Sequence, residues 1–408
     1  MHIKCTNGTP ILDTLDHLPP LPLFLDYNIF GFRGRSFIML TEQDELGIYH
    51  ALQLHDRVRH IDLRLPTSVL HEVVLLMDKP FPMLEYLSLS FAAEACVTLT
   101  LPKPFLAPNL RHLTMPSISP PRRLRFLAST VFLVALEISN IQSSSYFRPG
   151  LLLARLHSLP QLREMSIGFS VPIPRPSTER ELLGEKGASV TLPSLKIFRF
   201  KGVGAYLESL VAQIRSPLLE RFEITLFNQV AFVLPHLSHL INITEAFQLP
   251  SAAVVFDRNE VYVTTTYHSS RRFERGPFFL RVMCKQLDWQ IDSAAQICTS
   301  LNPTLSSVER FTLECSNDFE IPTALENGAI DGTTWHELLG SSIGVKELYI
   351  NKRLLEELSR ALQVDEVGSN PGFLPNLRSI SARRNLFTSF IDDRQVVGRP
   401  VAFSSWHY

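Results

Sequence analysis

The segment Pro82-Met83-Leu84-Glu85-Tyr86-Leu87-Ser88-Leu89 recurs in altered form along most of the chain. It combines a Pro-x-Leu opening and a charged residue with apolar side chains spaced as Leu-x-x-Leu-x-Leu. Five further copies of this opening begin at the following prolines: Pro108, Pro160, Pro193, Pro217 and Pro375. A unit that returns this often is typical of a repeat architecture in which each unit is one supersecondary structure.

The same spacing occurs without the proline at four further places: Val58/Ile61/Leu63, Leu133/Leu136/Ile138, Val308/Phe311/Leu313 and Val345/Leu348/Ile350. The last two apolar positions of each unit alternate at period two, which predicts a short strand with one buried face. Apolar residues at helical spacing in 68–79 and 204–215 predict helices between strands. One strand and one helix cannot bury their own apolar faces, so neighbouring units must stack. We therefore predict an α/β leucine-rich-repeat solenoid with irregular repeats, parallel strands on the concave side, and helices and loops on the convex side.

The composition fits a folded protein without a strong overall charge. Of 408 residues 62 are leucine, 45% are hydrophobic and 19% are charged, so a large core is available and wholesale disorder is excluded. Lys plus Arg number 39 and Asp plus Glu 40, which provides no field to hold a polyanion or an anionic membrane. No apolar run reaches the ~18 residues of a membrane span, and the first residues lack a signal-peptide core. We expect a cytoplasmic or nuclear protein that is not secreted, with no nucleic-acid or membrane partner.

The repeat pattern also predicts the organisation of the chain. Residues 58–385 are expected to form the solenoid, between an N-terminal lead-in or cap at 1–57 and a C-terminal cap at 386–408. Residues 170–192, rich in proline and charge, are expected to form an exposed loop. Residues 252–276 are expected to insert a hairpin, because β-rich runs flank a turn at 257–260.

An arginine-rich loop is expected to follow this hairpin. Arg271, Arg272 and Arg275 lie in the outgoing segment. They form either a basic contact patch or ordinary solvated loop arginines.

The sequence contains only weak matches to catalytic and metal-binding motifs. Gly340-Ser341-Ser342-Ile343-Gly344 matches the nucleophile elbow of hydrolases, which needs a strand before the serine and a helix after it. Here a helix-like segment (334–339) precedes the motif and a strand-like segment (345–350) follows, so the order is reversed. His236 and His239 have no cysteine or carboxylate nearby in sequence to complete a metal site, which favours surface histidines.

The cysteines are Cys5, Cys96, Cys284, Cys298 and Cys315, and their scattered spacing predicts neither a disulfide framework nor a zinc site. We therefore predict no catalytic, cofactor-binding or metal-binding residues, no cofactor and no enzyme activity.

The concave face of such a solenoid exposes the residue between the two buried strand positions of each unit. These candidate binding residues are Asp62, Ser88, Thr114, Glu137, Ser166, Arg199, Glu223, Thr312, Tyr349 and Ser381. All are polar or aromatic and both charge signs occur, which suits a protein ligand. The alternative interpretation is that solvent-facing strand positions are polar in every protein.

Seven segments carry a family likeness: Leu18-Pro19-Pro20-Leu21-Pro22-Leu23, Asp56-Arg57-Val58-Arg59, Pro80-Phe81-Pro82-Met83-Leu84-Glu85, Arg199-Phe200-Lys201-Gly202-Val203, Tyr206-Leu207-Glu208-Ser209-Leu210-Val211, Thr225-Leu226-Phe227-Asn228-Gln229 and Gly398-Arg399-Pro400-Val401. With them, nearly the whole chain resembles the F-box-like leucine-rich-repeat proteins of mushroom-forming fungi. The resemblance implies a substrate receptor of an SCF-type ubiquitin ligase, in which the F-box grips a Skp-type adaptor and the repeats hold the protein substrate.

The sequence departs from this family at one place. Leu18-Pro19-Pro20 is not followed by the acidic residue and amphipathic helices that an F-box requires. A Skp-type partner is therefore expected only if an F-box exists upstream. The alternative function is a leucine-rich-repeat interaction scaffold that is not coupled to ubiquitination.

Overall fold

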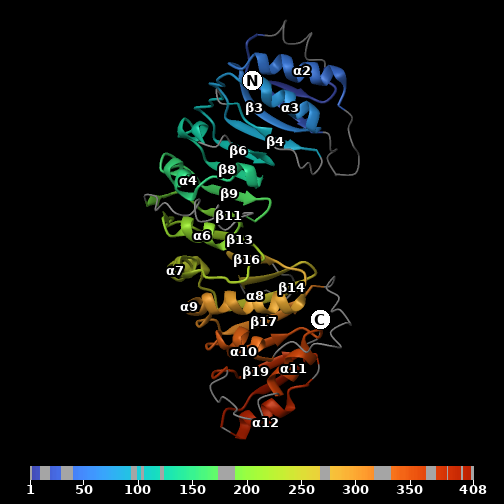
Figure 1. Ribbon diagram of the computed structural model, residues 1–408, viewed down its shortest axis with the longest axis vertical. Coiled ribbons are helices and arrows are strands. Elements are labelled where there is room, and N and C mark those ends of the chain that lie inside the picture. Colours follow the sequence, from blue (N-terminus) through green and yellow to red (C-terminus); the bar gives the residue numbers. More distant parts are fainter. Residues whose placement is uncertain are drawn as a thin grey trace. The chain divides into compact units, whose positions relative to one another are not determined.

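A computed structural model describes residues 2–9, 19–28, 40–92, 99–102, 105–119, 124–172, 189–266, 276–316, 332–363, 374–383, 385–396 and 398–405. The chain divides into two compact units, whose helices and strands are labelled in Figure 1. Unit 1 comprises residues 1–202 and 213–219, and unit 2 comprises residues 203–212 and 220–408. Most of the expected loop at 170–192 and the three arginines of the 271–275 segment lie outside the described residues.

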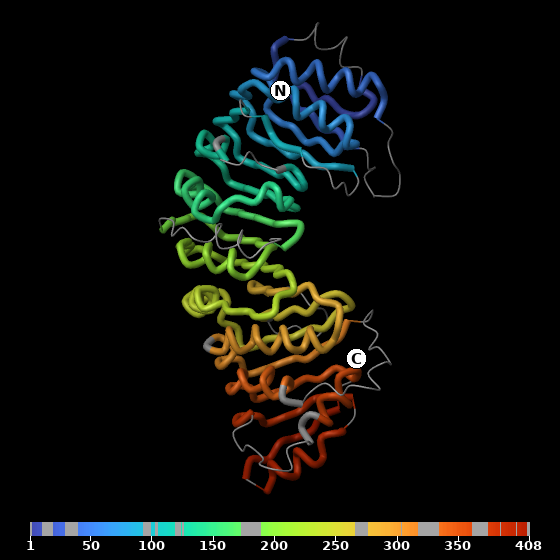
Figure 2. Tube along the Cα trace, in the orientation of Figure 1, coloured from blue at the N-terminus to red at the C-terminus, as the bar shows by residue number. Residues whose placement is uncertain are grey.

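The main sheet of unit 1 contains eight parallel strands among the described residues. In spatial order they are β1 (Ile3–Thr6), β2 (Leu23–Asn28), β3 (Val58–Leu65), β4 (Tyr86–Phe91), β6 (His112–Pro116), β8 (Ala135–Ile141), β9 (Glu164–Phe169) and β11 (Ile197–Gly202). Spatial order follows chain order, as the colour progression from blue to green shows (Figure 2). The smaller elements of this unit are β5 (Leu99–Thr100) paired with β7 (Ile118–Ser119), β10 (Val190–Thr191) paired with β12 (Ile214–Arg215), α2 (Glu42–Gln53), α3 (Thr67–Leu76), α4 (Pro149–Leu156), η1 (Arg125–Ala128) and η2 (Ser143–Ser145).

The leucine pattern forms the core of unit 1 as predicted. On β4, Leu87 and Leu89 are fully buried, and their register partners Ile61 and Leu63 on β3 are buried as well. The predicted helix at 68–79 is α3, which buries Val69, Leu70, Val73 and Val74. Alternation of apolar and polar residues therefore gives each strand a buried face that packs with the helices.

The main sheet of unit 2 has eight strands among the described residues. In spatial order they are β13 (Arg221–Phe227), β16 (Phe278–Met283), β15 (Glu260–Thr266), β14 (Ser251–Asp257), β17 (Arg310–Cys315), β18 (Glu347–Ile350), β19 (Ser379–Ala382) and β20 (Ala402–Ser405). β15 is antiparallel to both of its neighbours, and the other pairs are parallel. The helices of this unit are α6 (Gly204–Val211), α7 (Pro235–Ile243), η3 (Glu245–Phe247), α8 (Leu287–Ser300), α9 (Asn302–Leu305), α10 (Gly332–Gly340), α11 (Leu355–Gln363) and α12 (Thr388–Val396).

The hairpin expected at 252–276 is present as β14 and β15, with Asp257 and Glu260 as its last register pair. It does not project from the sheet. β14 pairs with β17 and β15 pairs with β16, so the hairpin supplies two strands of the main sheet.

The segments expected as caps also contribute strands. Within 1–57, β1 and β2 continue the sheet through β3, and within 386–408, β20 pairs with β19. Leu23, Leu25 and Tyr27 alternate at period two and are fully buried, although the Pro-x-Leu before them, Pro19-Pro20-Leu21, is followed by Pro22 and not by a charged residue. The fold class is therefore mixed α/β with mostly parallel strands, and the sheets extend beyond the repeats that the leucine pattern marks.

Candidate protein-recognition surface

In unit 1 the predicted binding residues lie in one row. Six of them are successive register partners across adjacent strands: Asp62, Ser88, Thr114, Glu137, Ser166 and Arg199. The row continues to Asp26 on β2 and Thr6 on β1, which the repeat pattern did not mark. We call these eight residues the polar row of unit 1. Their side chains lie on the sheet face opposite to the leucine core, because neighbouring strand residues point to opposite faces.

The polar row is less exposed than the repeat pattern predicts. Asp62, Thr114 and Glu137 are half-buried, and Ser88 is buried at 9% exposure. Adjacent strands lie only about 4.8 Å apart, so larger neighbours shield a small side chain between them. The row is therefore a densely packed surface rather than a line of freely solvated side chains.

A second row on the same face consists of aromatic and imidazole rings. Phe24, His60, Tyr86 and His112 are register partners on β2, β3, β4 and β6, two residues before the polar row on each strand. Ring centroids are 5.4 Å apart for Phe24 and His60, 4.2 Å for His60 and Tyr86, and 5.8 Å for Tyr86 and His112. His2 adds a ring 4.1 Å from Phe24. We call these five residues the ring row. In the sequence this row is indicated by an aromatic or imidazole side chain at the same position of four strands. Leucine spacing alone does not mark that position.

Burial controls the protonation of the ring row. Desolvation lowers the pKa of His60, and this outweighs the attraction of the nearby Asp62 and Asp26 carboxylates. Burial likewise raises the pKa of Tyr86, with Asp62 adding to the shift. Both rings are therefore neutral near pH 7.

Some charges of this face are paired within unit 1. Lys4 Nζ lies 2.8 Å from Asp26 Oδ2, and Arg199 lies 3.7 Å from Glu164. Asp62 and Glu137 have neither a hydrogen bond nor an ion pair with any residue that the structure describes. The face thus contains two carboxylates without a counter-charge.

In unit 2 the predicted row is interrupted. Thr312, Tyr349 and Ser381 are successive register partners, and Ser404 on β20 extends them. Glu223 is separated from Thr312 by three register positions, whose residues are Phe279, Thr264 and Ala253.

The intervening residues are buried. Phe279 is 4% exposed, and Thr264 and Ala253 are 2% exposed. The predicted residues of unit 2 therefore do not form one continuous row, because β14 is apolar on both faces, as the continuous run from Ala252 to Phe256 indicates.

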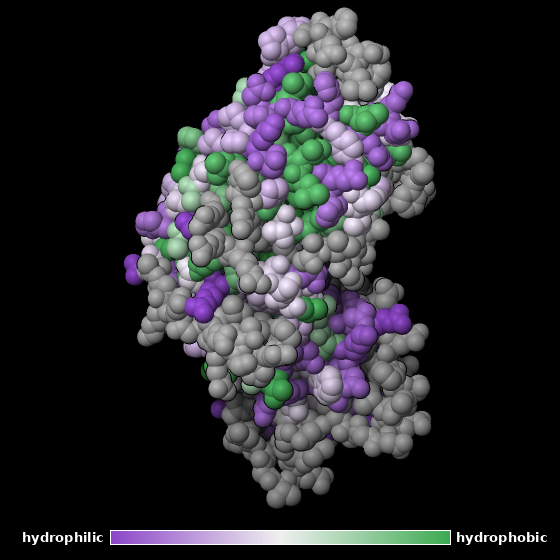
Figure 3. All heavy atoms as spheres, turned by 45° about the horizontal axis from the view of Figure 1, so that its top comes forward, coloured by the Kyte–Doolittle hydropathy of each residue, from purple (hydrophilic) through white to green (hydrophobic). Residues whose placement is uncertain are grey.

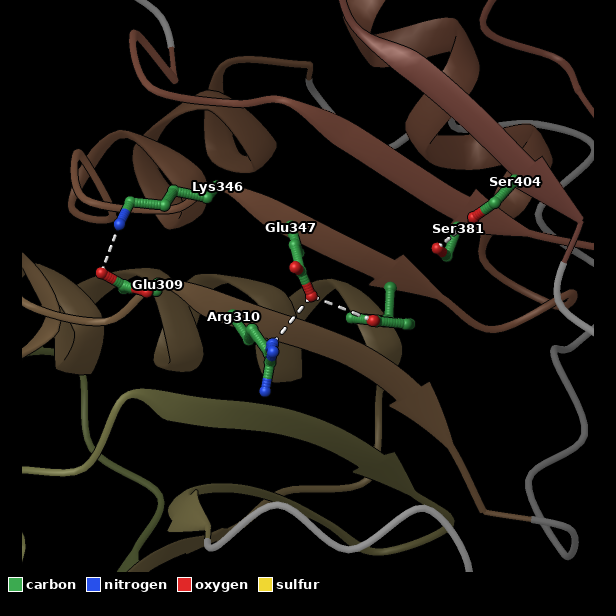
Figure 4. Close-up of polar contacts among 7 residues, drawn as sticks. Glu309, Arg310, Lys346, Glu347, Ser381 and Ser404 are labelled. Carbon is green, nitrogen blue, oxygen red and sulfur yellow. Dashed lines mark hydrogen bonds and ion pairs between the residues drawn. The ribbon is translucent and has the colours of Figure 1, made fainter.

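The polar side chains of unit 2 largely satisfy one another (Figure 4). Arg310 Nε donates to Glu347 Oε2 at 2.8 Å, and the Tyr349 hydroxyl donates to the same oxygen at 3.1 Å. Lys346 pairs with Glu309, and the hydroxyls of Ser381 and Ser404 are 2.6 Å apart. This part of the face therefore offers fewer unsatisfied groups to a ligand than unit 1 does.

A carboxylate missed by the repeat pattern, that of Glu314, lies two residues beyond Thr312 on β17 and on the same face. Burial raises the pKa of Glu314 on β17 to about 7, and its Oε2 has no hydrogen-bond partner in the described part of the chain. Because the folded state holds this proton more tightly than the unfolded state, stability falls as pH rises from about 4.5 to about 7.

Glu314→Gln is expected to stabilise the protein by about 1–2 kcal/mol at pH 8, after allowance for solvent screening, and to have almost no effect at pH 4. Urea denaturation at both pH values measures the difference. Glu356→Gln, at an exposed position of α11, is the matched control and should give the same small change at each pH. An equal gain from Glu314→Gln at both pH values would contradict the assigned cause.

The remaining motifs do not assemble a reactive site. Ser342 lies between α10 and β18, which confirms the predicted helix-to-strand order, and it is fully buried. The carboxylate of Glu208 on α6 accepts hydrogen bonds from the backbone N–H groups of His236 and Leu237 at 2.8 and 2.9 Å, so it caps α7.

The described residues also bear on metal binding, on the state of the cysteines and on membrane-spanning helices. They contain no group of three or more His, Cys, Asp or Glu side chains that could hold a metal ion. Cys5, Cys284, Cys298 and Cys315 are free and buried. No helix in the described ranges combines the length and apolar character needed to cross a bilayer.

Exposed apolar side chains are an alternative candidate for a binding surface. Leu46 on α2 and Leu75 on α3 are 48% and 59% exposed, and Val230 and Trp289 in unit 2 are 96% and 54% exposed. One face of the molecule shows hydrophobic side chains in the upper part of the view with hydrophilic ones around them (Figure 3). Single exposed apolar residues are common on soluble proteins, so the two rows of unit 1 remain the better-organised candidate.

In comparisons with known proteins, no family model and no curated protein matches this chain.

Proposed function

We propose that the chain is a protein-recognition module built as a leucine-rich-repeat solenoid, and that it acts as a substrate receptor of an SCF-type ubiquitin ligase. The observation that carries the recognition role is the polar row of unit 1. Its members come from eight consecutive parallel strands, and they meet on one face although they are far apart in sequence. A surface of half-buried polar and aromatic side chains of both charge signs resembles protein interfaces in composition.

The ligase role is supported by the resemblance to F-box-like fungal proteins. In that role the rows would contact the protein to be ubiquitinated, and a Skp-type adaptor would be bound by an F-box upstream of the repeats. The proposal assigns the chain no catalytic activity. The serine of its hydrolase-like motif, Ser342, is fully buried.

A specific observation favours the alternative of a scaffold without ubiquitination. The residues that follow Pro19 and Pro20 form strand β2, which is part of the sheet of unit 1. An adaptor-binding F-box at this position would require helices instead.

Binding to a purified Skp-type adaptor separates the two functions. The chain as it stands and a version extended upstream of Met1 are each immobilised and tested for adaptor capture. Capture by the extended version is the expected result of the receptor role. Failure of both versions would remove the ligase role and leave the scaffold function.

A further inference from the structure

β20 is the last strand of the unit 2 sheet, and among the described residues it pairs only with β19. The N–H of Ala402 donates to the carbonyl of Arg378 at 2.8 Å, so the backbone groups of Ala402 face β19. Successive residues of a strand direct their N–H and C=O groups to opposite sides. The backbone groups of Phe403 and Ser405 therefore face away from the sheet, where no strand in the described ranges pairs with them.

This edge lacks three features that commonly prevent an edge strand from pairing with another chain. These features are a lysine, a proline within the strand and a β-bulge. The residues of β20 read Ala-Phe-Ser-Ser, and their register with β19 has no shift. Ala402, Ser404 and Ser405 are exposed. The edge is therefore uncharged and accessible to another strand.

The end strand of the unit 1 sheet is different. β1 pairs only with β2 in the described part of the chain, and the N–H of Ile3 donates to the carbonyl of Pro22 at 2.9 Å. The backbone groups of Lys4 therefore face outward, and its ammonium group lies 2.8 Å from the carboxylate of Asp26. A lysine within an edge strand disfavours edge-to-edge pairing. Of β1 and β20, β20 is thus the strand suited to accept a further strand.

The apolar side chains of β20 determine which strand fits beside it. Phe403 is the register partner of Ile380, whose own partner on the next strand is Leu348. Ile380 and Leu348 are 0% and 1% exposed, whereas Phe403 is half-buried, so this apolar row ends with a ring that is not fully covered. Val401, just before the strand, lies on the same face and is buried. An added strand must therefore place an apolar side chain beside Phe403.

The other face of β20 has small side chains. The hydroxyl oxygens of Ser404 and Ser381 are 2.6 Å apart, and Ala402 lies on the same face as Ser404 (Figure 4). An added strand therefore needs small residues on this face and apolar residues on the other. β20 itself has this pattern, because Val401 and Phe403 alternate with Ala402 and Ser404.

We infer that two copies of the chain associate through β20, with the two strands antiparallel about a two-fold axis and the two Phe403 residues opposite one another. In this register the Phe403 residues exchange both of their backbone hydrogen bonds, and Val401 of each copy does the same with Ser405 of the other. A two-fold interface uses the same patch of both copies, so the patch must be self-complementary. A second copy meets this requirement, because it supplies the alternation that β20 needs without adding a charge. The inference is independent of the proposed recognition function.

The expected dimer is weak. Two strands of four residues bury much less than the about 1,200 Å² of a stable complex, so the association is reversible and increases with protein concentration. Sedimentation equilibrium of the whole chain should give a mass of 46.2 kDa in dilute solution. The weight-average mass should rise toward twice this value as the concentration increases from about 5 µM to about 300 µM. A chain that stays monomeric throughout would overturn the inference.

Ser405→Pro and Ser405→Ala are matched variants for the hydrogen bonds of this edge. Both lose the hydroxyl, but only the proline lacks the outward N–H. Ser405→Pro is expected to weaken association about tenfold, and Ser405→Ala should leave it unchanged. Circular dichroism should show the same fold for both, because the lost N–H does not face β19. Equal association of the two variants would contradict the pairing through β20.

An exchange of charge at Phe403 tests the register. Phe403→Lys and Phe403→Glu each place like charges directly opposite one another, so each variant alone should remain monomeric. An equal mixture should associate again, because lysine then faces glutamate. Thermal unfolding of each variant alone checks that the monomers are folded. Variants that each dimerise like the unchanged chain, or a mixture of folded variants that stays monomeric, would overturn the antiparallel arrangement about Phe403.

Discussion

Leu113→Ala is expected to lower the free energy of unfolding by about 3–4 kcal/mol, whereas Thr114→Ala next to it should change that free energy by less than about 0.5 kcal/mol. Leu113 is fully buried on β6, and its register partners Leu87 and Leu136 are buried on the strands at either side. Removing the isobutyl group leaves a cavity within a row of packed side chains. Thr114 is half-buried on the opposite face, where solvent and neighbours can adjust.

Urea denaturation followed by circular dichroism measures both variants. They differ by one position in sequence and by the face of the sheet, so each controls for the other. A loss from Thr114→Ala as large as that from Leu113→Ala would show that the core face and the polar face have been assigned to the wrong sides of the sheet.

Gly344→Ala is expected to cost about 3 kcal/mol, whereas Gly340→Ala should be neutral or stabilise the protein by up to about 1 kcal/mol. A Cβ atom on Gly344 would lie 2.1 Å from the backbone oxygen of Ser306 and 3.1 Å from that of Val308. These segments lead into β17 and β18, and the N–H of Lys346 donates to the carbonyl of Glu309 at 2.8 Å, so neither backbone can retreat easily. A Cβ on Gly340, the last residue of α10, meets no atom within 4 Å.

The two glycines bracket the serine motif that matches a hydrolase elbow, and the paired variants show what the glycines do. If both variants have the same small effect, the close approach at Gly344 is absent and the turn between α10 and β18 is looser than described. Thermal unfolding of the two purified variants is sufficient, because the expected difference corresponds to several degrees in Tm.

The sequence predicts which face of a strand each side chain occupies better than it predicts which strands lie next to each other. Alternation places Leu87 and Ser88 on opposite faces whatever lies beside them, so six of the eight members of the polar row of unit 1 could be predicted from the sequence. Alternation does not say which strand is adjacent. The position of β14 between β15 and β17 therefore could not be predicted, although the hairpin itself could.

The residues of the candidate site that the sequence did not predict were missed for a similar reason. Asp26 was not predicted because the segment before β2, Pro19-Pro20-Leu21-Pro22, lacks the charged residue that follows Pro-x-Leu in the other units. The burial of Glu314 and of the face around Ala253 depends on residues outside their own strands. The pattern of a single strand does not contain this information. His60 and Tyr86 were visible as residues, but their stacking depends on register between strands.

The strand order of unit 2 has a consequence for synthesis of the chain. In unit 1 each new strand can dock on the one made just before it, so the sheet can grow as the polypeptide emerges. β13 has its neighbour in β16, and about 50 residues separate the end of one at Phe227 from the start of the other at Phe278. Pairing over such a separation is slower than pairing of nearby segments. During synthesis, the edge of β13 that pairs with β16 therefore stays unpaired until the hairpin and β16 have emerged from the ribosome. We expect a chaperone to bind the nascent chain at this edge.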